Sequence, residues 1–295
     1  MTDPSPIGVG VIIVTYNSAG EIAACLESLA AAATSPLSIV VVDNASHDGT
    51  ADLVQSNFPD VCLIRNDSNK FYAAANNQGL ERVSGQYILL LNPDVVLPIG
   101  GIEALVAVLE RDSRYAAVAP LLAGPDGRRQ QSVREFPDLA TLWYDLLGLS
   151  FLFPHSERFG HWRMGYFDGE SERDVAQPMA SCLLIRRTVI AEIGLFDERY
   201  PMFFNDVDWC KRVWGRGWKI RYTSTVRVQH LGGASTRQRK IRMIWMSHAA
   251  YFRYLRQSCS DPVWRFLAVW LSAPFLFLAA ALRTVSWGLR RLLGR

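Results

Sequence analysis

The sequence predicts an α/β fold whose core is a doubly wound, mostly parallel sheet with helices on both faces. As far as Val118, short apolar runs alternate with helical segments of about 10 to 15 residues, which is typical of parallel βαβ units. Two of these runs are followed by an aspartate: Asp43 comes directly after residues 39–42, and Asp94 comes three residues after the run that ends at Leu91. The carboxyl ends of such strands form the ligand-binding edge of open α/β sheets, so the sequence predicts a ligand there.

The elements of the first half follow from their periodicity. Apolar runs predict strands at residues 9–14, 39–42, 61–65 and 87–91. Apolar residues at helical spacing predict helices at 19–33 and 72–83, and a third that begins at Asp48-Gly49-Thr50 and reaches residue 58. Asp48 stands in a capping position, where its carboxylate can accept the unpaired N–H groups of the first turn.

The pattern loosens after Val118. Residues 134–176 are aromatic and weakly periodic, which favours an insertion or lid rather than a second domain. Strands are expected at 179–186, 219–222 and 226–229, a short helix at 206–214, and a basic, aromatic helix at 237–257. We therefore expect a domain of residues 1–257, with one half at 1–118 and another at 119–257, followed by a tail at 258–295.

The net charge of +3 conceals a split between the two parts of the chain. Residues 209–295 hold 17 Lys and Arg against one acid, Asp261, whereas residues 1–208 hold 14 basic and 27 acidic residues. Such a split indicates an anionic partner for the second part: nucleic acid, anionic lipid or pyrophosphate. The five cysteines are scattered without metal-ligand or redox spacing, which is typical of reduced thiols in the cytosol, and no cleaved signal peptide is expected.

The tail contains an uncharged stretch of 17 residues, 266–282, between Arg265 and Arg283. This length is at the lower limit for a spanning helix, and flanking arginines are typical of a helix that lies in the membrane interface or dips into the bilayer. A buried core helix is the alternative. The apolar stretch favours lipid over nucleic acid as the anionic partner, so we expect an anionic membrane surface and no nucleic acid.

Two phosphate-binding motifs are absent from the sequence. The turn after the first strand, Thr15-Tyr16-Asn17-Ser18, lacks the glycines of dinucleotide-binding folds, and no Gly-Lys-Ser/Thr loop occurs. Dehydrogenase and P-loop activities are therefore disfavoured. Six other segments are rich in polar residues: 14–17, 42–50, 69–79, 91–94, 203–210 and 228–235.

These six segments resemble glycosyltransferase family 2, the inverting enzymes with the GT-A fold. The resemblance spans residues 8–257 and is strongest to the subgroup that includes bacterial rhamnosyltransferases of surface-polysaccharide assembly. It implies that residues 1–118 are the nucleotide-binding half and residues 119–257 the acceptor half. It implies that Asp43 binds the base of a nucleotide sugar, since a carboxylate accepts from imide or amino N–H groups. The remaining implied nucleotide and sugar-diphosphate contacts are Thr15, Tyr16, Asn17, Asn44, Asn69, Asn76, Asn77 and Asn92. Helix capping and turn formation are the structural alternatives for Asp43 and the asparagines.

The resemblance also implies a divalent cation, Mg²⁺ or Mn²⁺, held by Asp94. These hard ions commonly take one or two protein carboxylates together with substrate phosphates. The family carries two aspartates around one residue, whereas Asn92 stands at the first position here and supplies no charge. The strictness of metal dependence is therefore open. His230 matches a late histidine that completes the metal site in some members, with a plain structural role as the alternative.

Asp206 matches the aspartate that the family places at a helix start facing the acceptor, which implies that it is the catalytic base. Capping of that helix is the alternative. Asp208 is two residues on and cannot share a helical face with Asp206, so at most it supports the diphosphate or acceptor. Arg237 and Arg239 are further candidates for diphosphate or acceptor contacts, because guanidinium groups pair well with phosphate.

These implications predict an inverting glycosyltransferase that moves a sugar, rhamnose included, from a nucleoside-diphosphate sugar to a polyprenyl-linked saccharide. It would act at the cytoplasmic face of the bacterial inner membrane, as a peripheral or monotopic protein. Two alternatives stay open: a sugar-phosphate nucleotidyltransferase, and a non-catalytic nucleotide-sugar-binding scaffold with Asn92 and Asn205 as signs of decay. The oligomeric state, a homodimer included, is also open.

Overall fold

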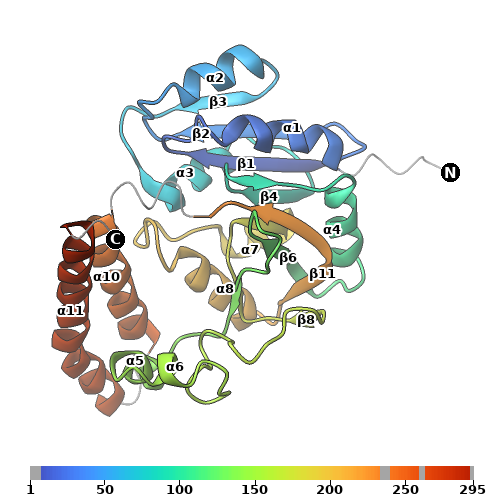
Figure 1. The fold of residues 1–295 in the computed structure, drawn as a ribbon. Helices are drawn as coiled ribbons and strands as arrows, with labels where there is room; N and C mark the ends of the chain where they lie inside the picture. Colours follow the sequence, from blue (N-terminus) through green and yellow to red (C-terminus); the bar gives the residue numbers. More distant parts are fainter. Residues whose placement is uncertain (1–7, 233–239, 259–262, 293–295) are drawn as a thin grey trace. The chain divides into compact units, whose positions relative to one another are not determined.

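The computed structural model describes residues 8–232, 240–258 and 263–292 (Figure 1). The described chain divides into two compact units. The first contains residues 8–134, 168–201 and 205–232, and the second contains 135–167, 202–204, 240–258 and 263–292. The insertion expected at 134–176 thus belongs mostly to the second unit. The predicted division after residue 257 separates two helices that the structure groups together.

The main sheet of the first unit has, among the described residues, nine strands in the order β3-β2-β1-β4-β10-β6-β11-β5, with β8 beside β11. Their bounds are β1 Val9–Thr15, β2 Ser38–Asp43, β3 Cys62–Arg65, β4 Tyr87–Leu91, β5 Val95–Val96, β6 Tyr115–Ala123, β8 Arg173–Asp174, β10 Cys182–Arg186 and β11 Lys219–His230. β3, β2, β1 and β4 run parallel, as do β6 and β11, whereas β10 is antiparallel to both β4 and β6. A second sheet pairs β7 (Val133–Arg134) with β9 (Gln177–Pro178).

Helices cover both faces of this sheet, as the sequence predicts. They are α1 Ile22–Ala32, α2 Thr50–Asn57, α3 Phe71–Leu80, α4 Gly101–Leu109, α7 Arg187–Ile193 and α8 Asn205–Gly215. Val11 and Ile13 of β1 pack in one cluster with Leu26 of α1 and Leu105 of α4. Ile12 points to the opposite face, where α3 packs on β1. Alternating β1 side chains therefore bury two helical layers.

The expected strands and helices of the first half occur close to their predicted bounds. The sequence pattern did not reveal β5, α4, β6 or α7, and the strand expected at 179–186 is shorter, at Cys182–Arg186. The two strands expected at 219–222 and 226–229 are one strand, β11, whose register against β6 shifts between Thr223 and Arg227. This irregularity interrupts the alternation of side chains and makes one strand look like two.

The second unit contains α5 (Leu139–Leu146), α6 (Leu149–Leu152), α10 (Lys240–Ser258) and α11 (Val263–Leu292). Aromatic rings join these segments: Trp143 packs on Phe275 at 5.3 Å between centroids, and Trp162 packs on Tyr251 at 5.2 Å. The tryptophans of the insertion therefore take part in packing. Among the described residues, Arg265–Arg291 is the stretch long and apolar enough to cross a membrane, by length and composition alone.

We expect Gly10→Ala to lower the free energy of unfolding by about 1–3 kcal/mol, because the added methyl group has no room. A Cβ at Gly10 would lie 2.3 Å from the carbonyl oxygen of Ser84 and 2.5 Å from Val83 Cγ2. Urea denaturation measures the change. Gly20→Ala is the matched control, since a Cβ there meets nothing within 4 Å. Equal stability of the two variants would contradict the packing described for β1.

Candidate active site

The carboxyl ends of β1 and β2 bring the first predicted residues together. The parallel register pairs Thr15 with Asp43, and Thr15 Oγ1 donates to Asp43 Oδ1 at 2.9 Å. Ser46 donates its backbone N–H to Oδ2 at 2.9 Å and its hydroxyl to Oδ1 at 2.5 Å. The buried carboxylate is therefore fixed by three donors. Oδ2 retains a lone pair that can accept from a ligand N–H group.

Asn44 and Asn69 tie the loop before α3 to this edge of the sheet. Asn44 Nδ2 donates to the Phe71 carbonyl at 3.1 Å, while its Oδ1 accepts from Asn66 Nδ2 at 3.1 Å and from the Lys70 N–H at 3.3 Å. Asn69 Oδ1 accepts from the Phe71 N–H at 2.8 Å. Both predicted nucleotide contacts thus have a structural role in shaping the loop.

Three non-glycine residues near this edge adopt the left-handed backbone conformation: Asn17 (φ 50°), Ala45 (φ 59°) and Phe71 (φ 64°). They follow β1, follow β2 and begin α3. Each such residue costs roughly 1–3 kcal/mol, and these conformations cluster at ligand sites. Asn17 also joins two loops, because its N–H donates to Ser46 Oγ at 2.9 Å and its Oδ1 accepts from the His47 N–H at 2.9 Å.

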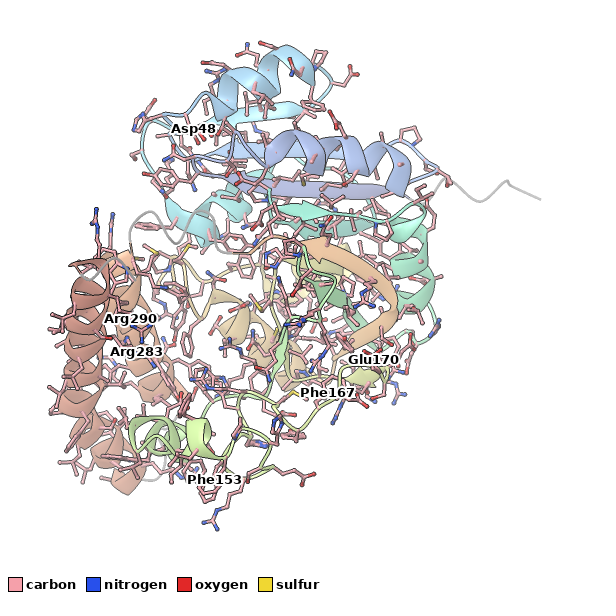
Figure 2. All side chains as sticks on the ribbon, in the orientation of Figure 1. Asp48, Phe153, Phe167, Glu170, Arg283 and Arg290 are labelled. Carbon is pink, nitrogen blue, oxygen red and sulfur yellow. The ribbon has the colours of Figure 1, made fainter. Side chains whose placement is uncertain are left out.

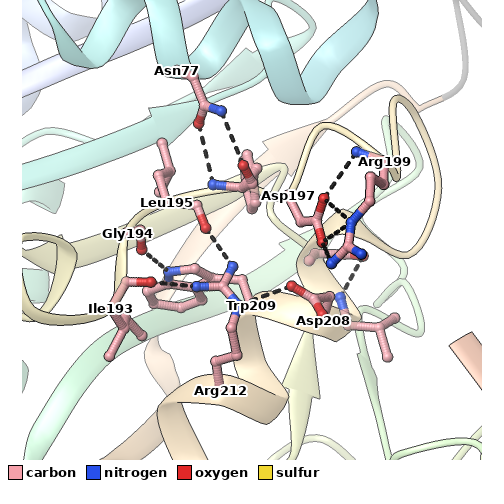
Figure 3. Close-up of polar contacts among 12 residues, drawn as sticks. Asn77, Ile193, Gly194, Leu195, Asp197, Arg199, Asp208, Trp209 and Arg212 are labelled. Atoms are coloured by element: carbon pink, nitrogen blue, oxygen red, sulfur yellow. Dashed lines mark hydrogen bonds and ion pairs between the residues drawn. The ribbon is translucent and has the colours of Figure 1, made fainter. Parts of the chain in front are cut away.

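The other predicted nucleotide residues divide between the edge and the interior. Tyr16 is half-buried at the end of β1. Asn76 is buried, and its Nδ2 donates to the Tyr72 carbonyl within α3 at 2.8 Å. Asn77 pairs with the backbone of Phe196 in both directions, at 2.9 and 3.1 Å (Figure 3). Asn76 and Asn77 therefore hold α3 and its neighbouring loop in place.

Asp94 and His230 meet because β5 pairs with the end of β11. His230 is the register partner of Val95, and its Nε2 lies 3.5 Å from Asp94 Oδ1, with both side chains buried. Gln130 orients the ring, since its Nε2 donates to the His230 carbonyl at 2.7 Å and its Oε1 accepts from Nδ1 at 2.7 Å. In the neutral ring, Nδ1 then carries the proton and Nε2 presents a lone pair beside the carboxylate.

The donor set at Asp94 and His230 fits a divalent cation that is shared with a phosphate. Asp94 Oδ2 also accepts from the Gly232 N–H at 3.0 Å, which fixes the carboxylate. No cluster of three or more His, Cys, Asp or Glu that would suit a metal occurs in the described part of the chain. Two protein ligands suffice for Mg²⁺ or Mn²⁺ when a diphosphate supplies further oxygens.

Asn92, two residues before Asp94, bonds to the neighbouring strand region. Its backbone N–H donates to the Ser181 carbonyl at 2.8 Å, and its Nδ2 donates to Ser181 Oγ at 3.2 Å. The amide thereby fixes the turn that carries Asp94. An aspartate could not donate to Ser181 in this way, which gives Asn92 a physical use apart from charge.

Asp206 stands at the start of α8 with a carboxylate that is mostly withdrawn from water. This desolvation raises the pKa of Asp206, and the Val207 N–H at 2.9 Å and the positive charge of Arg134 offset only part of the effect. Gln177 Nε2 donates to its Oδ2 at 3.2 Å. Arg134 and Gln177 face each other across β7 and β9, so the small second sheet places both beside Asp206. A carboxylate with a raised pKa is a stronger base.

Tyr72 connects Asp206 with Asp94. Its hydroxyl donates to the Ala180 carbonyl at 2.8 Å. Burial raises the pKa of Tyr72, and the negative charges of both Asp206 and Asp94 act in the same direction. The charges of both carboxylates therefore act on the pKa of the same buried tyrosine.

Asp208 has a different environment from Asp206. Its carboxylate pairs with Arg212 Nε at 2.9 Å, and Arg212 donates to the carbonyls of Ile193 at 2.6 Å and Leu195 at 2.5 Å (Figure 3). This network ties α8 to the segment after α7. The predicted contact of Asp208 with a diphosphate or acceptor has no support in this geometry.

The predicted contacts Arg237 and Arg239 lie outside the described residues. Sequence reasoning also missed the residues that orient the site: Ser46, Tyr72, Gln130, Arg134, Gln177 and Ser181. Ser46 and Tyr72 lie within quoted segments and had a weak signal. The others stand alone in the sequence, and only the folded chain reveals what they contact.

The family model for "Glycosyl transferase family 2" matches residues 10–174, which is more than half of the chain and runs from β1 to β8. The chain belongs to glycosyltransferase family 2. It is therefore a glycosyltransferase, as the six segments predicted. Asp206 and His230 lie beyond the matched residues, so their roles depend on the geometry described above.

Among curated relatives, the chain is similar to the N-acetylglucosaminyl-diphospho-decaprenol L-rhamnosyltransferase of Mycobacterium tuberculosis. The two are 32% identical over 247 residues, which cover 80% of this chain and 78% of the relative. A low-salt glycan biosynthesis hexosyltransferase of Haloferax volcanii is 24% identical over 210 residues, which cover 70% of this chain and 61% of that protein.

Solved structures show the GT-A fold. GalNAc-T7, crystallised with UDP, GalNAc and Mn²⁺, matches with a TM-score of 0.55 and 15% identity over 77% of this chain. TarS of S. aureus matches with a TM-score of 0.53 and 17% identity over 80% of this chain. The matches cover only 44% and 38% of those chains, and at this identity they establish the fold alone.

We expect His230→Gln to weaken Mn²⁺-dependent binding of UDP and dTDP by at least about tenfold, because one of the two protein ligands expected for the cation would be lost. Calorimetric titration with and without Mn²⁺ measures the change. His161→Gln is the matched control, since His161 is exposed and belongs to the second unit. Unchanged affinity for both nucleotides in the His230 variant would remove this residue from the cation site.

Proposed function

We propose that this glycosyltransferase moves an L-rhamnose-type sugar, with inversion, from a nucleoside diphosphate to a saccharide linked to a polyprenyl diphosphate. The observation that carries the proposal is the 32% identity, over 80% of this chain, to an enzyme named for an L-rhamnosyl product and a decaprenol-linked acceptor. The reaction would take place at the cytoplasmic face of the membrane. The four described cysteines are free thiols, which suits that reducing compartment.

On the donor side, Asp43 would accept from the nucleobase, with Thr15 and Ser46 holding its carboxylate in one orientation. Asp94 and His230 would hold a Mg²⁺ or Mn²⁺ ion, which when bound neutralises charge on the departing diphosphate. The network around Asn44 would keep the loop before α3 shaped for the donor. The positions of these residues support the proposed roles, because each lies at the carboxyl end of a strand or in the loop that follows it.

On the acceptor side, Asp206 would take the proton of the acceptor hydroxyl while that oxygen attacks the anomeric carbon. The bond to the diphosphate breaks as the new glycosidic bond forms on the opposite face, so one displacement inverts the configuration. The Val207 N–H and Gln177 hold the carboxylate, and its raised pKa makes it a better proton acceptor.

A panel of nucleoside-diphosphate sugars tests the proposal, with a short polyprenyl-diphospho-N-acetylglucosamine as acceptor and mass spectrometry as readout. Transfer of rhamnose in preference to hexoses supports it. Efficient transfer of another sugar alone would overturn the donor assignment. Nucleotide binding without any transfer would favour the scaffold alternative, and release of diphosphate from a nucleoside triphosphate with a sugar phosphate would favour a nucleotidyltransferase.

We expect Asp206→Asn to lower kcat by about 10²–10⁴-fold while donor affinity is kept, because an amide cannot take up the proton. Asp208→Asn is the matched control on the same helix turn. It removes the ion pair to Arg212 and should reduce stability while kcat stays within a few-fold of the parent. Turnover by single-substrate kinetics and donor affinity by calorimetry separate the two effects. A larger loss of kcat in the Asp208 variant would instead assign the base to Asp208.

The base assignment also predicts a change in pH dependence. The positive charge of Arg134 lowers the pKa of Asp206, so Arg134→Gln should raise that pKa further. Transfer needs the ionised carboxylate and is lost as the pH falls through this pKa. The acid limb of the kcat profile should therefore move to higher pH in the variant. Arg111→Gln, which breaks a surface pair with Glu172, is the control and should leave the limb in place.

A further inference from the structure

Helix α11 of the second unit has one buried face. Val269, Ser272, Leu276 and Ala280 are each at most 1% exposed, and their spacing of three and four residues places them on one side of the helix. Helix α10 packs along α11, with ring contacts of Trp245 to Phe277 and of Phe252 to Trp270.

The rest of α11 presents an exposed apolar surface. We call this surface the α11 apolar face; its residues are Val263, Phe266, Leu267, Trp270, Leu271, Phe275, Phe277, Leu278, Leu282, Val285 and Leu289, and each is 37–70% exposed. They recur at helical spacing from the first residue of α11 almost to the last. A continuous face of this length exceeds the scattered apolar residues of an ordinary water-exposed surface.

Three of the four arginines of α11 avoid this face. Arg265, Arg283 and Arg290 lie 7, 11 and 18 residues from the buried Ser272, which places them on its side of the helix, towards the ends. Figure 2 labels Arg283 and Arg290 on this helix. The described residues of α10 and α11 carry eight Lys and Arg and no acid. A helix with an apolar face and with arginines on the other side, towards its ends, complements the acyl chains and phosphate groups of an anionic lipid leaflet.

The packing of α11 argues against a spanning orientation, although its length would permit one. Trp143 of α5 contacts Phe275 near the middle of α11. If the helix crossed the bilayer, α5 and α10 would be drawn to the same depth. Arg253 of α10 and the Asp145–Arg163 ion pair next to Trp143 would then lie in or beside hydrocarbon, where charged side chains are costly.

We propose that α11 lies flat on an anionic lipid leaflet, with the α11 apolar face among the acyl chains and Arg265, Arg283 and Arg290 at the level of the phosphates. Helices α10 and α5 then border this face, because their rings pack on Trp270, Phe275 and Phe277. The proposal concerns lipid contact alone and does not depend on the donor, the acceptor or the base proposed above. Its tests use binding and labelling, so that their failure is distinct from failure of the enzymatic assays.

Vesicle flotation tests the contact. The full chain should float with vesicles of phosphatidylcholine and phosphatidylglycerol, and less with phosphatidylcholine alone. Leu271→Glu combined with Leu278→Glu should weaken partition at least about tenfold, because two exposed apolar side chains of the face are replaced by charges. The control is Ile99→Glu, since Ile99 is an isolated residue of the first unit and is 88% exposed. Undiminished flotation of the double variant would overturn the proposal.

Cysteine labelling tests the orientation. Single cysteines at Arg265 and Arg290, in a chain in which Cys62 and Cys259 are serine, report both ends of α11 after binding to preformed vesicles. In the flat orientation, an impermeant maleimide added outside labels both positions fully without detergent. A spanning helix would leave one end unlabelled until detergent is added, and that result would overturn the proposal.

A second copy of the chain is the rival occupant of the α11 apolar face. Light scattering after gel filtration without lipid distinguishes the two cases. A dimer that the paired Glu substitutions convert to a monomer, with flotation unchanged, would assign the face to self-association and overturn the lipid contact. A parent and double variant of equal mass, together with the loss of flotation, supports the lipid contact.

Discussion

The pairing of β5 with the end of β11 is the constraint on which the site depends. β5 has only two residues, yet it places Asp94 beside His230, which is far away in the sequence. Gln130 then closes the arrangement by binding both the ring and the carbonyl of His230. Burying two polar side chains such as Asp94 and His230 costs free energy unless other groups hold them in position. The pairing of β5 with β11 provides this restraint.

Around Asp94 and His230, the polar side chains of the site are held by hydrogen bonds within the protein. Asp43 receives three hydrogen bonds from Thr15 and Ser46, while Asn77 binds the backbone of Phe196. Left-handed residues at the ends of β1 and β2 add backbone strain that the surrounding bonds must sustain. Such a rigid frame suits an enzyme that must hold a flexible diphosphate sugar against a second substrate, since orientation supplies much of the rate.

The two compact units do not coincide with the two halves, 1–118 and 119–257, that the sequence predicts. The first unit contains the described residues that we propose for donor binding, cation binding and proton transfer. The second unit contains α10 and α11, which carry basic and apolar residues without acids in their described parts. The proposed lipid-linked acceptor and the proposed leaflet contact of α11 are compatible, because both would keep the enzyme close to the membrane.

The sequence by itself determined the α/β class, the strands β1 to β4, the helices between them and the family. Each of these is encoded locally, by alternating or helical periodicity and by polar residues directly after apolar runs. Only the tertiary structure decided which candidates meet. It separated Asp206 from Asp208, which are neighbours in sequence, because one carboxylate faces Gln177 and the other pairs with Arg212. Strand order and register depend on contacts between distant residues, and no local pattern records those contacts.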